Sequence, residues 1–302
     1  MIEKSGFTHT LKFGKRKLQI QTTYDAAEHR AIVTISDAGQ ILDKREYRFD
    51  KSVKDAPLDQ QIRQCHDLVL ADLDLLHATI SNVQTTQDTS SYARLGSLLQ
   101  QRGFYDEAME VISGLHALDD QYENSRFLLG KAQVGKGLYE EAIKNLQLAT
   151  EKTPDYPDVL FWLSRAHYQQ ANYTQAIQLV RSALEINPEY YEARFNLALY
   201  LIESAVADPK NVDLPTPIER IKEARTCLLQ AAEFSAAYDR RAVDSVVELL
   251  EDLDHWPQAV AALKDINQLR VSTSQSQITD NDFYLRFMFA AAKEKHWGLR
   301  PA

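Results

Sequence analysis

The chain has 302 residues and a formal net charge of −9 at pH 7, and 44% of its residues are hydrophobic. This length suggests two domains or one array of repeats, and the hydrophobic content is ordinary for a folded protein. The negative charge argues against nucleic acid or an anionic membrane surface as a partner, because phosphate groups attract a positive surface.

Targeting and redox features are few in this sequence. No apolar run approaches the roughly 20 residues that a helix needs to cross a bilayer, and the first residues lack the apolar core of a secretory signal. The two cysteines, Cys65 and Cys227, encode neither a disulfide framework nor a zinc knuckle. We therefore expect a cytoplasmic protein without membrane insertion.

Residues 1–56 have the alternating pattern of β-strands. Apolar and polar side chains alternate from Phe7 to Phe13, which is the period of a strand, and the alternation resumes after a turn at Gly14-Lys15. A β-branched run over 31–36 and a further strand over 41–49 follow. The segment predicts a four-stranded antiparallel meander with one apolar face that needs a cover. It does not resemble a particular family.

Residues 57–88 predict that cover and a linker. Pro57 suits the first turn of a helix, and apolar residues recur at helical spacing from Ile62 to Ile80. A helix over 57–80 is about 36 Å long at 1.5 Å per residue, so it can lie across the sheet and also pack on the element that follows. The polar residues 81–90 predict a linker or loop.

A spacing of 34 residues organises the rest of the chain. Small, aromatic and apolar residues recur at this spacing in one register. The matched positions are Leu95, Leu129 and Leu163; Gly96 and Gly130; Tyr105, Tyr139 and Tyr173; Ala108, Ala142 and Ala176; and Pro154 and Pro188. The pattern resembles the tetratricopeptide repeat, a helix–turn–helix unit of 34 residues. The resemblance implies units at about 89–122, 123–156 and 157–190, each of which buries its apolar face on its neighbour.

The register is interrupted after the third unit. The next alanine that opens a second helix is Ala224, 48 residues after Ala176, so about 14 residues are inserted. The insertion contains three prolines, which cannot continue a helix interior. It predicts an irregular loop at 205–217 within a fourth unit, 191–237. A fifth and diverged unit is expected at 240–269.

The expected fold class is α+β but mainly α. A small β-meander and a long helix precede a right-handed α-solenoid over 89–269, and a tail over 270–302 follows. In that tail, the Ser/Thr/Gln-rich residues 271–279 predict a tether, and residues 282–296 predict a helix that is apolar around most of its circumference. We expect this helix to dock on the last repeat and a second surface, to lie in the chain's own groove, or to cap the array. Docking on another copy would make a homo-oligomer.

The sequence contains no motif of an enzyme, a metal site or a cofactor site. None of the eight histidines has a metal-binding spacing, and His66 and His77 are about 16 Å apart along one predicted helix. Gly135-Lys136-Gly137 lacks the spacing of a phosphate loop. Asp72 and Asp74 point apart on their helix and form no paired-carboxylate site. We predict a non-catalytic protein without metal or cofactor.

A stripe of aromatic and basic residues on successive first helices is the candidate site. The three phenylalanines of the stripe are 34 residues apart, and two cations recur beside them at the same spacing. The resemblance implies that first helices line the concave groove of the array. Two interpretations are open: the rings complete the packing between repeats, or they anchor a peptide with apolar and acidic residues. The stripe consists of Phe127, Lys131, Phe161, Arg165, Tyr168 and Phe195.

The sequence favours some classes of protein partner over others. Some tetratricopeptide proteins hold chaperone C-termini through a clamp of Lys, Asn and Arg side chains. This chain has Ala93, Ser97 and Leu128 at the matching positions, which disfavours a co-chaperone. We expect a non-catalytic adaptor that binds a protein segment in the groove. The alternatives are a self-assembling scaffold and a regulator whose activity lies in the N-terminal β module.

Overall fold

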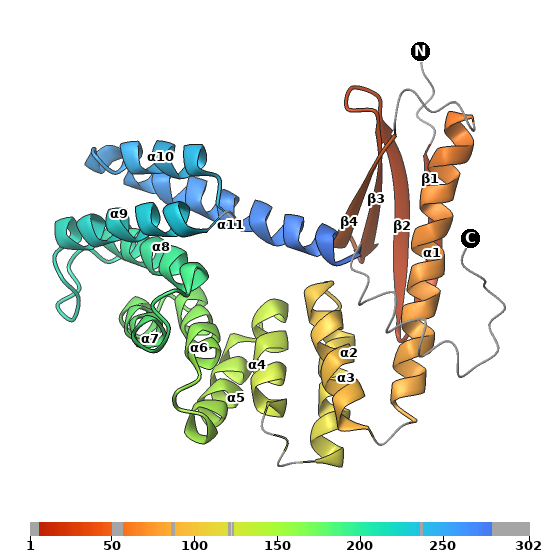
Figure 1. Ribbon diagram of the computed structural model, residues 1–302, viewed down its shortest axis with the longest axis horizontal. Coiled ribbons are helices and arrows are strands. Elements are labelled where there is room, and N and C mark those ends of the chain that lie inside the picture. Colours follow the sequence, from red (N-terminus) through yellow and green to blue (C-terminus); the bar gives the residue numbers. More distant parts are fainter. Residues whose placement is uncertain are drawn as a thin grey trace. The chain divides into compact units, whose positions relative to one another are not determined.

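The computed structural model describes residues 6–49, 57–85, 88–119, 122, 124–235 and 238–279, and the side chains of these residues as far as 268 (Figure 1). The chain divides into two compact units. The first contains the chain up to Leu118, and the second runs from Asp119 to Val271.

The first unit begins with a four-stranded antiparallel sheet. Its strands are β1 (Phe7–Phe13), β2 (Arg16–Asp25), β3 (Arg30–Asp37) and β4 (Gln40–Arg48), and they neighbour one another in chain order. The predicted meander is therefore confirmed. Alternate residues of β2 are buried, as the strand period requires.

Helix α1 (Leu58–Val83) covers one face of this sheet (Figure 1). Its buried side recurs at helical spacing and includes Ile62, Val69, Leu73 and Leu76. One polar contact crosses the interface: Thr22 Oγ1 on β2 lies 2.8 Å from His66 Nδ1 on α1. The predicted cover over 57–80 is thus present and extends three residues further than expected.

The first helix pair, α2 (Thr89–Gln101) and α3 (Tyr105–Leu118), belongs to the same unit as the sheet. Asp72 on α1 accepts from Arg45 on β4 and from Arg102 at the end of α2. The rings of Phe13 and Phe104 are 5.1 Å apart. These contacts join the first helix pair to the sheet and α1, and the first unit ends at Leu118, whereas the sequence pattern predicted a division after residue 88.

The second unit is built from antiparallel helix pairs. The helices are α4 (Ser125–Lys136), α5 (Tyr139–Lys152), α6 (Pro157–Gln169), α7 (Tyr173–Ile186), α8 (Tyr191–Ala207), α9 (Pro217–Phe234), α10 (Arg240–Leu249) and α11 (Trp256–Thr279), with a short 3-10 turn at Leu253–His255. The recurring small residues lie where paired helices touch. A Cβ added at Gly130 would meet Leu146 at 2.6 Å, and Ala142 and Ala176 are fully buried. The 34-residue spacing therefore marks positions of close helix approach.

The predicted insertion forms the α8–α9 connection. It occupies residues 208–216, slightly less than the expected 205–217, because α8 continues to Ala207. The buried Leu214 and a capping box between Thr216 and Glu219 fix its second half. Arg220 Nη2 donates to the Asp208 carbonyl at 3.2 Å and so binds the end of α8. The loop leaves the helix pair intact.

Helix α11 corrects one prediction. The Ser/Thr/Gln-rich residues 271–279 continue this helix and do not form a tether. Serine and glutamine lower helix propensity by only a few tenths of a kcal/mol relative to alanine, so a helix that is already nucleated can continue through them. The expected helix over 282–296 lies outside the described residues.

Candidate functional site

The three phenylalanines of the predicted stripe form a ladder of aromatic pairs. Each ring meets the tyrosine that precedes the next first helix. The pairs are Phe127 with Tyr156 at 5.8 Å, Phe161 with Tyr190 at 5.0 Å, and Phe195 with Tyr238 at 4.4 Å between ring centroids. Phe161 and Phe195 are 1% and 0% exposed, and Phe127 is half-buried. The rings of Phe161 and Phe195 thus have no free face for a ligand in this structure.

The two cations of the stripe meet at one ring that the sequence analysis did not select. Lys131 Nζ lies 5.1 Å from the centre of the Trp162 ring, and Arg165 Cζ lies 4.4 Å from it. Within the described residues, neither cation has a hydrogen-bond acceptor or a carboxylate in ion-pair range. Burial lowers the pKa of Lys131, although the charges of Asp158 and Glu192 act in the opposite direction. The trio is therefore a partly desolvated positive site with no carboxylate in direct ion-pair contact among the described residues.

A groove of about 600 Å³ begins beside this trio. Helices α6 and α8 form two of its walls, and α11 forms a third. Arg165 belongs both to the trio and to the groove. The side chains that line the groove include Arg165, Tyr168, Tyr173, Asn196, Leu199, Glu203 and Lys264.

A polar contact joins α6, α8 and α11 inside the groove. The Tyr168 hydroxyl donates to Glu203, and Lys264 Nζ lies 2.9 Å from the other oxygen of the same carboxylate. The Tyr168 ring stacks on the buried ring of Tyr200 at 4.2 Å. Burial and the Glu203 carboxylate raise the pKa of Tyr168, so its hydroxyl stays a donor at neutral pH. The Glu203 carboxylate is thereby paired, whereas Arg165 has no ion-pair partner among the described residues.

The structure brings some residues of the predicted stripe together. Arg165 and Tyr168 lie together in the groove, and Lys131 lies next to them on the Trp162 ring. Trp162 and Asn196 were missed, although they are 34 residues apart and directly follow the phenylalanine column. Lys264 was also missed. It lies on α11, outside the column of first helices from which the stripe was predicted.

The described residues offer no constellation for catalysis. No group of three or more His, Cys, Asp or Glu residues in that part of the chain is placed to hold a metal ion. Both cysteines are buried, and burial raises the pKa of Cys227 to about 11, so its thiol stays protonated at neutral pH. Among the described helices, none has the length and apolar content needed to cross a membrane.

Stacked helix pairs with a 34-residue period define a helical-repeat protein. The family model of the tetratricopeptide repeat matches residues 127–191 and 163–204. The helices within residues 127–204 therefore have the sequence pattern of tetratricopeptide repeats, an architecture that serves as a scaffold for protein interactions. No curated protein sequence matches the chain significantly.

Solved structures of other repeat proteins are similar to this chain. TTC0263, a thermophilic TPR protein from Thermus thermophilus, is 20% identical, with 68% of this chain and 100% of that chain covered and a TM-score of 0.45. YrrB, described as a TPR protein with an unusual peptide-binding site, is 16% identical, with 63% and 93% covered and a TM-score of 0.41. MamA from Desulfovibrio magneticus RS-1 is 15% identical, with 49% and 76% covered and a TM-score of 0.41.

Proposed function

We propose that this chain is a non-catalytic adaptor that binds an extended protein segment in the groove of α6, α8 and α11. An acidic side chain of that segment lies against Lys131 and Arg165. Apolar side chains lie along Tyr168 and Tyr173. The segment therefore combines acidic and apolar residues.

The observation that carries this proposal is the pair of cations on Trp162 without a carboxylate partner in the described part of the chain. Both cations are already partly desolvated, so much of the cost of removing them from water is met in the free protein. A carboxylate that reaches Arg165 forms charge-assisted hydrogen bonds, and the planar guanidinium allows two of them. A cation–π contact contributes about 0.5–2 kcal/mol and holds the guanidinium in place for this acceptor.

The size of the groove supports a segment with several side chains. Its volume of about 600 Å³ lies within the range of sites that enclose a ligand of that size. The paired Glu203 does not repel an acidic segment, because Tyr168 donates to it and Lys264 pairs with it.

The test is selection from a random peptide library by the full chain. We expect the enriched peptides to carry Asp or Glu beside aromatic or aliphatic residues. The reversals Lys131→Glu and Arg165→Glu should each weaken binding of an enriched peptide by about tenfold or more. Lys144→Glu on α5 is the matched control, because Lys144 is exposed and lies outside the groove. Equal loss in the Lys144 variant, or enrichment without acidic residues, would refute the proposal.

A further inference from the structure

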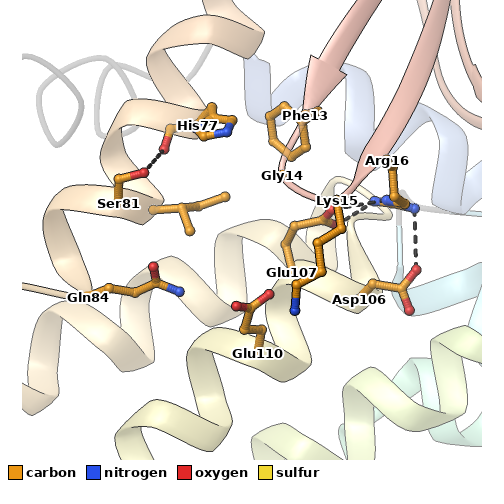
Figure 2. A pocket seen from close by; sticks show the side chains of 11 residues that line it. Phe13, Gly14, Lys15, Arg16, His77, Ser81, Gln84, Asp106, Glu107 and Glu110 are labelled. Atoms are coloured by element: carbon orange, nitrogen blue, oxygen red, sulfur yellow. Dashed lines mark hydrogen bonds and ion pairs between the residues drawn. The ribbon is translucent and has the colours of Figure 1, made fainter.

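The first unit contains a second cleft, separate from the repeat groove (Figure 2). Three elements enclose it: the β1–β2 hairpin, the C-terminal half of α1 and the first turns of α3. Its volume is about 340 Å³. That value lies at the lower end of the range for ligand sites, so the cleft has room for one long side chain or a small molecule and not for a peptide.

One side of the cleft is apolar. Phe13 is fully buried at its floor, and Ile80 lines the wall that α1 provides. The His77 ring meets Phe13 edge-on, with 5.6 Å between centroids and an interplanar angle of 83°. Figure 2 shows His77 and Ser81 on successive turns of α1, and Gln84 directly after its end, beside this floor. An aliphatic stem can therefore bury itself here while a polar head remains further out.

The opposite side is acidic, and only part of its charge is compensated. Arg16 binds three carboxylates: Glu107 in a two-point contact, with Nε to Oε1 at 3.0 Å, and also Asp37 and Asp106 at 3.2 and 3.3 Å. Glu110 lies one turn further along α3, and its carboxylate has no hydrogen bond or ion pair with the described residues. Among the described residues, with Lys15 at the exposed hairpin tip, the cleft and its Arg16 network hold four carboxylates and two cations. These described side chains are net negative.

We propose that this cleft binds an arginine side chain of a partner protein. Asp106 and Glu110 are four residues apart on one helix face, so their carboxylates are neighbours. A planar guanidinium can donate to both of them, which a compact ammonium does less well. The methylenes of the arginine lie along Ile80 and the His77 ring. Lys15 opposes the ligand by charge repulsion from the rim.

This arrangement predicts opposite effects for two rim substitutions. Glu110→Gln removes the unpaired acceptor charge and should weaken binding by about fivefold, the upper range for an exposed ion pair. Lys15→Ala removes a repelling cation and should tighten binding about twofold. A ligand that is an anion would give the reverse signs for both variants.

The experiment uses the full chain and two small probes, N-acetyl-arginine amide and its neutral isostere N-acetyl-citrulline amide. Titrations are followed by saturation-transfer NMR. We expect saturable binding of the arginine probe, and binding of the citrulline probe that is weaker by about fivefold or more. Glu28→Gln is the control, because Glu28 is exposed in the same unit and lies outside the cleft. It should leave the binding constant unchanged.

Several outcomes would overturn the proposal. Equal binding of the two probes shows that the charge is not recognised. If Glu110→Gln leaves the binding constant of the arginine probe unchanged, the probe binds outside the cleft. If Glu203→Gln abolishes the saturation-transfer signal, the probe binds in the repeat groove. A further variant changes Lys293, Lys295 and Arg300 to Ala. If this variant binds the arginine probe more tightly, the occupant of the cleft is the chain's own C-terminal segment and not a partner protein.

Discussion

The Phe195 ring stacks on the Tyr238 ring with 4.4 Å between centroids and an interplanar angle of 9°. Tyr238 lies 43 residues after Phe195, whereas Tyr190 lies only 29 residues after Phe161. The difference of 14 residues equals the insertion. The loop at 208–216 is therefore accommodated without loss of the aromatic contact that joins one repeat to the next.

The first prediction concerns this ladder. Phe195→Ala and Phe161→Ala should each lower the free energy of unfolding by about 3–5 kcal/mol, because both rings are buried and leave a cavity. Urea denaturation of the full chain, followed by circular dichroism, measures the change. Phe234→Ala is the matched control: its ring also stacks on a tyrosine, Tyr191, but is 60% exposed, so little stability should be lost.

The opposite result would favour the interpretation in which the phenylalanines anchor a peptide. If Phe161→Ala leaves the urea midpoint unchanged and weakens a selected peptide by about 2 kcal/mol, the ring is a binding hot spot. In that case the buried conformation would have to open before the peptide binds.

Local periodicity accounts for what the sequence predicted well. The period of two in β1 to β4, the helical period in α1 and the interruption of the 34-residue columns can be read directly from the sequence, so the strands, the helix over 57–80 and the loop at 205–217 were predicted to within a few positions. The face of α6 that carries Arg165 and Tyr168 followed from the helical angle alone.

Tertiary contacts account for what the sequence did not predict. The spacing of Phe161 and Phe195 is the same whether the rings point to a ligand or to Tyr190 and Tyr238. Only the packing of the next repeat separates the two interpretations. The boundary after Leu118 likewise depends on Asp72, whose arginine partners are 27 and 30 residues away in sequence. No local pattern reveals such pairs.

The second prediction concerns the Asp72 carboxylate, whose side chain is 17% exposed. Asp72 Oδ2 lies 2.7 Å from Arg45 Nη2 and also accepts from Arg102, and the two arginine side chains are 8% and 2% exposed. Burial opposes the charge of Arg45, but Asp72 and Asp43 outweigh it and raise the pKa of this guanidinium. Asp72→Asn removes the counterion that both arginines share, while Arg45 keeps its ion pair with Asp43, so the change should cost the first unit about 3 kcal/mol.

Hydrogen exchange of β4, α1 and α2 is the suitable measurement, because it reports the first unit separately. Asp74→Asn is the control. Asp74 is exposed on the same helix, and its substitution should change stability by about 0.5 kcal/mol or less. Unchanged exchange protection in Asp72→Asn would show that the ion pairs do not stabilise this unit.

The third prediction concerns pH and His66. This side chain is 6% exposed between α1 and the sheet, with Nδ1 2.8 Å from Thr22 Oγ1. Burial lowers the pKa of His66 below 6.5. The neighbouring His9 and Arg63 lower it further, and Asp67 partly opposes them. The unfolded chain therefore binds a proton at this histidine once the pH falls below about 6.5, whereas the folded chain binds it only at lower pH.

The sign of the effect follows from this difference in proton binding. Where the unfolded state binds more protons, the free energy of unfolding rises with pH. The stability of the first unit should be full above pH 6.5 and should fall as the pH drops from 6.5 to the lower pKa of the folded state. One such histidine gives a slope of at most about 1.4 kcal/mol per pH unit.

The measurement compares hydrogen exchange of β2 and α1 at several pH values between 5 and 7.5, after correction for the intrinsic exchange rate. His66→Gln should remove the slope in this unit while keeping a polar partner for Thr22. His255→Gln should not, because His255 is exposed in the second unit. If the slope persists in His66→Gln, the destabilisation at low pH comes from another group. The interface of α1 with the sheet would then not be the element that responds to protonation.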